Sequence, residues 1–319
     1  MAEKLKLALY WAASCGGCEI AVVELREKLL IVDQVADILF WPVAIDAKYK
    51  DVEAFPDGHI DVCLFNGAIR TSENEHLANL LRKKSKVLVA FGSCANEGCM
   101  PGLANLYDRQ SIFEYAYLGS PSVDNPGKIV PQTSNKMPEG EIQIPKFYQT
   151  VKTLSQVVDV DYHVPGCPPQ APQIWSVIEA IVQGALPPKG SVVGANEKTV
   201  CDECKHDRKE KAIKRFYRLH EIIPDSTQCL FDQGLICAGP ATRGGCGSLC
   251  TKVDVPCRGC YGPPPHVLDQ GAALMSACSS VVDADTEEEA ARIVNEIADP
   301  IGTFYRFGLA ASLLHRRKV

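Results

Sequence analysis

Cysteine is the residue type that most constrains this chain: 15 of the 319 residues are cysteine, and eight of these lie between Cys201 and Cys260. The start of the sequence has no long apolar stretch before a small-residue cleavage site and no paired arginines, so we expect no export signal. In a reducing compartment, so many cysteines indicate metal ligands rather than disulfides. The sequence therefore predicts a metal-binding protein.

Composition excludes several classes of protein. Hydrophobic residues make up 46% and charged residues 23%, which is ordinary for globular proteins and excludes wholesale disorder. The formal net charge of −6 argues against binding nucleic acid by bulk charge, so we expect no nucleic-acid partner. No apolar run reaches the ~18 residues that a membrane span needs. We therefore expect no membrane span.

Short apolar runs alternate with amphipathic stretches in the first half of the chain. This alternation predicts an α/β fold with a doubly wound parallel sheet, and the flavodoxin-like strand order is the one we expect. The predicted strands are Leu5–Trp11, Ile38–Ile45, Ile60–Asn66, Lys86–Gly92 and Val158–Val164. The predicted helices are Glu19–Val32, Glu73–Lys84 and Gln170–Val182.

A proline-rich stretch, Ser120–Gln149, separates the fourth and fifth predicted strands. A loop of this length is uncommon inside a compact domain. It is either disordered or held in place by a partner protein, and the sequence leaves both alternatives open.

The pattern changes around Gly184–Glu197, which is typical of a linker. We therefore predict two domains, residues 1–190 and 191–319, the second rich in cysteine and poor in regular structure. Within its cysteine-rich part we expect one basic helix, Arg208–Ile222. Two further helices, Asp285–Ile297 and Thr303–Arg316, should close the chain. The stretch from Cys201 to Cys260 would contain only the basic helix and could not bury much apolar surface. We therefore expect metal to organise it.

Four cysteines follow predicted strands of the first domain: Cys15, Cys18, Cys94 and Cys167. The carboxyl ends of parallel strands meet at one edge, where open α/β sheets build their sites. Four thiolates converging there fit either a 4Fe-4S cluster or a tetrahedral zinc ion. Because the chain has neither a Gly-x-Gly-x-x-Gly motif after its first strand nor a phosphate-binding loop motif, nucleotide binding in this domain is not favoured.

The eight cysteines of the second region allow two interpretations. A zinc ribbon would pair the Cys201-x2-Cys204 and Cys257-x2-Cys260 motifs but would leave four cysteines without a role. Two four-cysteine clusters use all eight, and with the first domain they assign twelve of the 15 cysteines. We expect the other three to be packing residues (Cys63 and Cys278) or a spare thiol (Cys99). Three clusters without another cofactor motif indicate electron transfer.

These motifs resemble those of the small subunit of NiFe hydrogenases, and the resemblance covers nearly the whole chain. The family carries a proximal 4Fe-4S cluster in a flavodoxin-like domain, followed by an iron–sulfur domain with medial and distal clusters. The resemblance implies three 4Fe-4S clusters here. Their implied ligands are Cys15, Cys18, Cys94 and Cys167 (proximal), Cys246, Cys250, Cys257 and Cys260 (medial), and Cys201, Cys204, Cys229 and Cys237 (distal).

Two positions differ from the exported members of that family. Cys201 stands where those members have a histidine ligand, and Cys250 stands where they have a proline and carry a three-iron cluster. All-cysteine ligation leaves a cluster potential lower than histidine ligation does. Together with the lack of an export signal, this implies a cytoplasmic enzyme. The resemblance is greatest to the methyl-viologen-reducing (deazaflavin-non-reducing) hydrogenases associated with heterodisulfide reductase in methanogens.

Other classes are carried as alternatives. These are the small subunit of an NAD(P)-linked sulfhydrogenase, a quinone-reductase-like iron–sulfur subunit, and a zinc-organised scaffold without a redox role. The quinone-reductase family typically has adjacent cysteines after its first strand and lacks the 201–260 region. A brown colour of anaerobically purified protein would separate the iron–sulfur interpretations from the zinc scaffold.

The resemblance also implies partners and a proton-handling residue. The catalytic NiFe centre would lie only in a partner large subunit. A further iron–sulfur or flavin subunit would collect the electrons, linking the chain to heterodisulfide reductase. Glu19, directly after Cys18, matches the family's proton relay. A carboxylate at a helix start is also favoured by the helix dipole alone, so both interpretations of Glu19 stay open.

Overall fold

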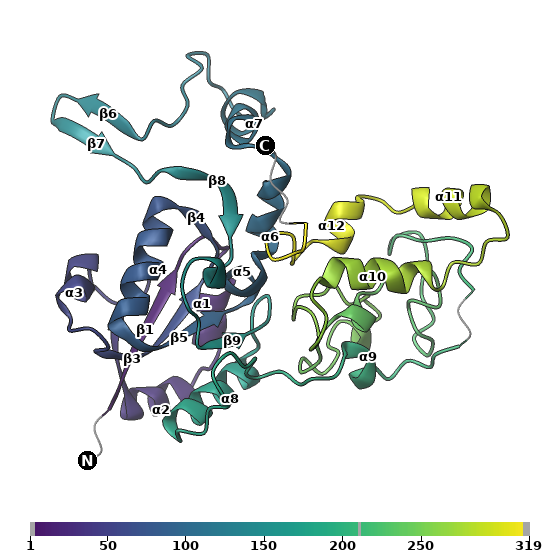
Figure 1. Ribbon diagram of the computed structural model, residues 1–319, viewed down its shortest axis with the longest axis horizontal. Coiled ribbons are helices and arrows are strands. Elements are labelled where there is room, and N and C mark those ends of the chain that lie inside the picture. The colour runs from purple at the N-terminus through teal and green to yellow at the C-terminus, as the bar shows by residue number, and fades with distance from the viewer. Residues whose placement is uncertain (1–3, 210–211, 315–319) are drawn as a thin grey trace.

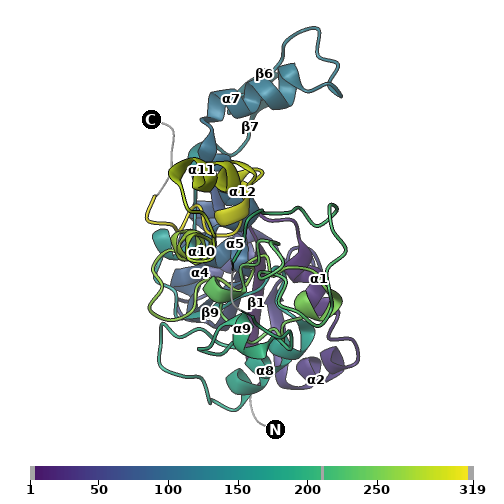
Figure 2. The same cartoon turned by 90° about the vertical axis from the view of Figure 1, so that its right-hand side faces the viewer.

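The computed structural model describes residues 4–209 and 212–314 (Figure 1, Figure 2). Within these residues, the first half of the chain contains a parallel sheet with the order β2-β1-β3-β5-β9. Taken in chain order, its strands thus stand 2-1-3-4-5, and the predicted α/β class and flavodoxin-like order are confirmed. The strands are β1 (Leu5–Trp11), β2 (Ala36–Phe40), β3 (Ile60–Asn66), β5 (Ser85–Phe91) and β9 (Tyr162–Val164).

Successive side chains of the central strands enter two separate hydrophobic layers. Tyr10 of β1 belongs to one layer and its neighbour Leu9 to the other, because strand side chains alternate between faces. Helix α4 (Ser72–Lys84) contributes to the first layer, and α1 (Gly17–Val23) and α8 (Ala171–Val182) contribute to the second. The sheet is therefore covered on both faces, and its edge at the carboxyl ends of the strands remains available for a site.

Three predicted elements of this part are shorter than expected. The helix Glu19–Val32 is interrupted between α1 and α2 (Lys28–Val35), where Arg26 has a φ of 53°. The strand predicted to Ile45 ends at Phe40, two residues before Pro42, which has no N–H group for a sheet ladder. The strand predicted from Val158 begins at Tyr162.

The proline-rich stretch is not structureless. It contains an antiparallel hairpin of β6 (Ser134–Met137) and β7 (Gly140–Gln143), all of whose residues are exposed. Figures 1 and 2 show this hairpin standing away from the rest of the chain. Further along, β8 (Phe147–Lys152) returns to pair with β4 (Ile69–Thr71). The short helices α5 (Ser93–Glu97), α6 (Cys99–Gly102) and α7 (Arg109–Glu114) lie between β5 and the hairpin, and α3 (Tyr49–Ala54) precedes β3.

The cysteine-rich part has its own hydrophobic core. Buried Phe216, Phe231, Leu274 and Ile293 belong to one cluster of side chains there. Between α9 (Val200–Glu203) and α10 (Gln270–Ser279), the described residues form turns, two short 3-10 helices and isolated bridges. Helices α11 (Glu287–Asn295) and α12 (Pro300–Phe304) follow. In the described part of the chain, no helix is long and apolar enough to span a bilayer.

The predicted basic helix Arg208–Ile222 is wrong for the residues that the structure describes, while Glu210 and Lys211 lie outside them. The backbone instead bonds to distant segments: the Ile213 N–H donates to Val281 O at 2.8 Å and the Tyr217 N–H to Gly234 O at 2.9 Å. Tertiary pairing thus replaces the local hydrogen bonds of a helix. The predicted helix Thr303–Arg316 is also wrong for its described residues, because helical structure ends at Phe304 and turns follow up to Leu314, while His315 and Arg316 lie outside the described residues.

Candidate metal centres

The structure brings the four predicted proximal ligands to the carboxyl edge of the sheet. Cys15 and Cys18 follow β1, Cys94 lies on α5 directly after β5, and Cys167 follows β9. Cys18 and Cys94 are buried, whereas Cys15 and Cys167 are exposed. The loops after β5 and β9 are joined by the Ser93 N–H, which donates to Gly166 O at 2.8 Å. The strand-end pattern in the sequence therefore corresponds to real proximity.

Gly92 makes room for one of these sulfurs. Its φ of 84° lies in the left-handed region, and a Cβ built there would overlap Cys18 Sγ. The same Cβ would lie 3.5 Å from Gly166 O. The end of β5 is thus a cradle whose missing side chain leaves space for a thiol and for whatever the thiol binds.

A fifth thiol lies in the proximal group. Cys99 is 1% exposed, has a φ of 46°, and its Sγ lies 3.8 Å from Cys167 Sγ. A hydrogen bond with Cys167 lowers the pKa of Cys99, but a hydrogen bond with Cys94 and burial raise it, and the net shift is upward. Sequence reasoning treated Cys99 as a spare, although its place five residues after Cys94 was the available signal. The proximal region therefore offers five sulfurs where a cubane needs four.

The four predicted distal ligands line one small pocket. Cys201, Cys204, Cys229 and Cys237 share it with His206, and apolar side chains such as Leu230 and Phe231 close it. Gly239 again makes room for sulfur, because a Cβ there would lie 3.0 Å from Cys201 Sγ and 3.6 Å from Cys237 Sγ. These are the four cysteines that the family resemblance implies as the distal ligands.

The predicted medial ligands lie between the other two groups. The Cys257 N–H donates to Cys237 Sγ at 3.2 Å, which joins the medial and distal ligands. On the other side, the Ser93 hydroxyl, next to Cys94, donates to the Cys260 carbonyl. The three groups are therefore contiguous, in the order proximal, medial, distal.

Burial makes these thiols reluctant to ionise in the absence of a cation. It raises the pKa of Cys237 to about 12, and that of Cys260 to about 12, where the nearby Cys246 and Cys250 add to the effect. A bound metal reverses this preference, because it holds its ligands as thiolates.

Thiolate-only donor sets suit iron–sulfur clusters or zinc. No group of three or more His, Cys, Asp or Glu side chains within residues 4–209 and 212–314 is arranged to hold a single metal ion. The glycine cradles and the all-sulfur donors fit iron–sulfur clusters.

Glu19 points into the protein rather than into solvent. It is 6% exposed, its Oε1 accepts from Asn66 Nδ2 at 3.1 Å, and its Oε2 accepts from Trp41 Nε1. Burial raises the pKa of Glu19, and the hydrogen bonds from Asn66 and Trp41 oppose that rise. These two hydrogen bonds hold the carboxyl group in one orientation beside Cys18. A carboxylate placed only to interact with the helix dipole would not need them.

The other two cysteines are packing residues, as predicted. Cys63 of β3 is fully buried in a sheet layer, and Cys278 of α10 is 4% exposed in the core of the second region. Three arginine side chains, Arg218, Arg258 and Arg306, also lie near Cys257, and no sequence pattern predicts that they meet there.

Comparison with known proteins gives relatives for the first domain and for the whole chain. The family described as "NADH ubiquinone oxidoreductase, 20 Kd subunit" matches residues 15–181. The iron–sulfur subunit of the F420-non-reducing hydrogenase of Archaeoglobus profundus is 43% identical over 319 residues, covering 98% of each chain. A subunit of the F420-non-reducing hydrogenase of Methanothermobacter marburgensis is 36% identical over 321 residues, covering 98% of this chain and 97% of that protein.

A solved structure resembles part of the fold. A chain of the NAD+-reducing [NiFe]-hydrogenase in its H2-reduced state superposes with a TM-score of 0.50 and 26% identity. The match covers 58% of this chain and 94% of that one. The two full-length relatives extend the similarity over 98% of this chain.

Proposed function

The chain belongs to the family of F420-non-reducing hydrogenase iron–sulfur subunits, and from this premise we propose that it carries electrons from a NiFe centre in a partner large subunit to a further redox subunit. The acceptor would be an iron–sulfur or flavin subunit linked to heterodisulfide reductase, in the cytoplasm. The observation that carries the proposal is the contiguous row of three four-cysteine groups.

The cysteines would hold three 4Fe-4S clusters, each of which supplies a reversible one-electron acceptor. The chain's own part is to fix the ligands. Gly92 and Gly239 leave room beside the sulfurs, and the Cys257 N–H donates to the sulfur of Cys237. A hydrogen bond to a ligating sulfur tunes a cluster's potential. The buried thiols are held as thiolates only while a cation offsets their desolvation.

The full-length relatives favour this proposal over the quinone-reductase-like alternative. Residues 15–181 match the 20 Kd subunit family, so the first domain is common to both classes of protein. The hydrogenase relatives also match the region beyond residue 181, which holds two of the three cysteine groups. An electron path that leads away from the first domain would need further clusters, and the cysteines for them lie in that second region.

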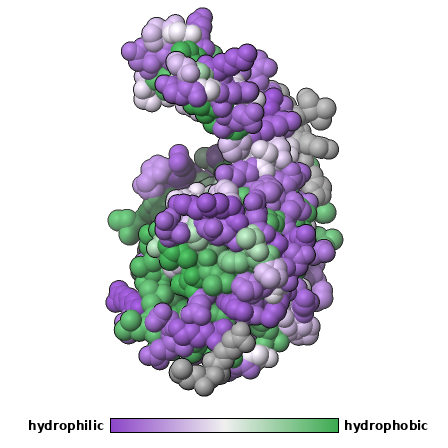
Figure 3. All heavy atoms as spheres, turned by 90° about the vertical axis from the view of Figure 1, so that its left-hand side faces the viewer, coloured by the Kyte–Doolittle hydropathy of each residue, from purple (hydrophilic) through white to green (hydrophobic). Residues whose placement is uncertain are grey.

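The large subunit would dock beside the proximal group. Helix α1, which contains Cys18, and the next helix, α2, carry exposed apolar side chains. These are Ile20 and Val23 of α1 and Leu30 and Ile31 of α2. Figure 3 shows hydrophobic side chains gathered on one face of the molecule. Contiguous exposed apolar surface is typical of a protein interface.

Metal analysis tests the proposal directly. Anaerobically purified complex should contain about 12 iron and about 12 acid-labile sulfide per copy of this chain, after subtraction of what its partners hold. It should be brown. A colourless chain containing zinc would overturn the proposal, and a reproducible ceiling of about eight iron would mean that one of the four-cysteine groups is assigned wrongly.

The exposed hairpin provides a test of the large-subunit interface. Lys128 and Lys136 are exposed in this chain alone, so trypsin should cut the isolated chain there. In the complex with the large subunit, we expect both sites to be protected, because the whole Ser120–Gln149 loop, which contains the hairpin, and the Cys15–Glu19 turn would be covered. Cleavage of an active complex at the rate of the isolated chain would show that this loop lies outside the interface.

A further inference from the structure

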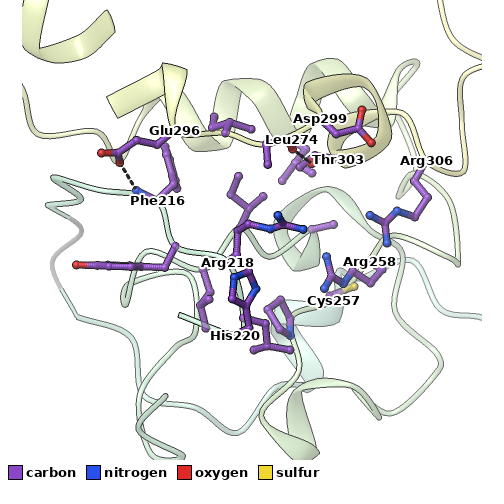
Figure 4. A pocket seen from close by; sticks show the side chains of 18 residues that line it. Phe216, Arg218, His220, Cys257, Arg258, Leu274, Glu296, Asp299, Thr303 and Arg306 are labelled. Carbon is purple, nitrogen blue, oxygen red and sulfur yellow. Dashed lines mark hydrogen bonds between the residues drawn. The ribbon is translucent and has the colours of Figure 1, made fainter. Parts of the chain in front are cut away.

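A cavity of about 610 Å³ adjoins the predicted medial group, of which only Cys257 lines it. The other lining residues come from four stretches, 216–220, 235–238 (without Cys237), 256–258 and 296–306 (residues 296–299, 303 and 306), with Leu274 of α10 on one wall. Figure 4 shows the side chains that line it, Cys257 among them. Its volume lies in the range of pockets that bind small molecules.

Cationic side chains from three of these segments meet in the cavity. Figure 4 shows Arg218, Arg258 and Arg306 directed into it, with His220 close by. Burial lowers the pKa of Arg306 and the nearby positive charge of Arg258 lowers it further, while the negative charge of Asp299 opposes both. Like charges gathered in this way repel each other, so the arrangement is stabilised when an anion lies among them.

The two carboxylates of the cavity, Glu296 and Asp299, offset the charge of the three arginines only in part. Glu296 Oε2 accepts from the Phe216 N–H at 3.3 Å, and Asp299 Oδ1 accepts from the Gly302 N–H at 3.0 Å. Across residues 4–209 and 212–314, no ion pair links any of the three arginines to a carboxylate. The cavity is therefore lined by more positive than negative groups, three arginines against two carboxylates, in a chain whose formal net charge is −6.

The remaining wall of the cavity is apolar. Leu235, Leu274 and Pro256 are buried side chains that line it, and Phe216 adds an aromatic ring. A bare inorganic anion would use the arginines and leave this wall unused. A ligand that joins an anionic group to an apolar or aromatic body would use both.

We propose that this cavity binds an organic phosphate of mononucleotide size, with its phosphate among Arg218, Arg258 and Arg306 and its body against the apolar wall. Guanidinium groups match phosphate oxygens with paired hydrogen bonds. A phosphate monoester carries up to two negative charges, which suits three arginines better than one carboxylate does. The site adjoins the proposed electron path at Cys257, but the three arginines that would hold the phosphate are not cluster ligands.

Calorimetric titration of the purified hydrogenase complex tests the proposal with three probes: AMP, inorganic pyrophosphate and adenosine. We expect saturable binding of AMP, weaker binding of pyrophosphate, and no binding of adenosine. The double variant Arg218→Gln/Arg258→Gln should weaken AMP binding by about tenfold or more. Lys50→Gln, an exposed cation on α3, should leave it unchanged.

A single variant keeps the test interpretable if the double variant loses iron. Arg218 is exposed and far in sequence from the cysteines, so Arg218→Gln should keep full iron content while weakening AMP binding. Pyrophosphate binding as tight as AMP would mean an adventitious anion only, and would overturn the proposal. Absence of AMP binding to the complex, or equal binding by wild type and both arginine variants, would overturn it as well.

Discussion

Replacing Glu19 with Gln should lower hydrogen oxidation by about 100-fold, the usual contribution of a positioned proton-transfer group. Splitting hydrogen releases protons, and Glu19 is a buried carboxyl group next to the proximal Cys18. Asn66 and Trp41 donate to its two oxygens and so fix its orientation. Glutamine keeps the shape but cannot exchange a proton. Hydrogen-dependent dye reduction by the whole complex measures the effect.

Two controls separate proton transfer from structure. Glu24→Gln changes an exposed carboxylate at the end of the same helix and should leave activity unchanged. Glu19→Asp retains a titratable carboxyl group and should recover part of the activity. Para- to ortho-hydrogen conversion should persist in Glu19→Gln, because it needs no net proton export. Wild-type turnover in Glu19→Gln, or equal loss in Glu19→Gln and Glu19→Asp, would return Glu19 to a structural role.

Replacing Cys237 with Ala should remove about four iron atoms per chain, while replacing Cys278 with Ala should remove none. The two thiols make a matched pair, since both are buried in the same hydrophobic cluster, at 6% and 4% exposure. Of these two thiols, Cys237 lines the distal pocket and Cys278 does not. The sulfur of Cys237 also accepts the Cys257 N–H. Iron analysis and visible absorption of the two purified variants measure the difference.

The electron path gives a second readout for this pair. Cys237→Ala should abolish transfer to the downstream subunit but retain hydrogen-dependent reduction of a small dye that can reach the proximal or medial group. Cys278→Ala should keep both reactions. Full iron content in Cys237→Ala would show that another residue is the fourth distal ligand. Equal iron loss in the two variants would point to a packing defect of the second region.

The parallel sheet could be predicted from the sequence because each strand is recognisable from the residues of its own short segment. The runs at β1 and β3 were placed with their observed bounds, since buried parallel strands are continuous apolar segments. The proximal cysteines followed from the same pattern, because each stands directly after a strand. By contrast, the segment around Ile213 and Tyr217 takes its shape from residues far along the chain.

Other parts of the candidate sites depend on contacts that no local pattern encodes. The donors that hold Glu19 are Trp41 and Asn66, 22 and 47 residues away from it. The proximity of Cys99 to Cys167 spans 68 residues. The arginine cavity combines residues 218, 258 and 306, which lie in unrelated segments. Each of these juxtapositions follows from the folded topology rather than from spacing.

The cradle at Gly92 has a consequence for how related genes are interpreted. A methyl group at that position would occupy the space of the Cys18 sulfur, so even alanine would displace this proposed ligand without altering any cysteine. A homologue with all its thiols intact but another residue there would be expected to have lost its proximal centre. Surveys that infer electron-carrying ability from cysteine motifs alone would classify such a homologue as competent. Inspecting one glycine codon would reveal the defect.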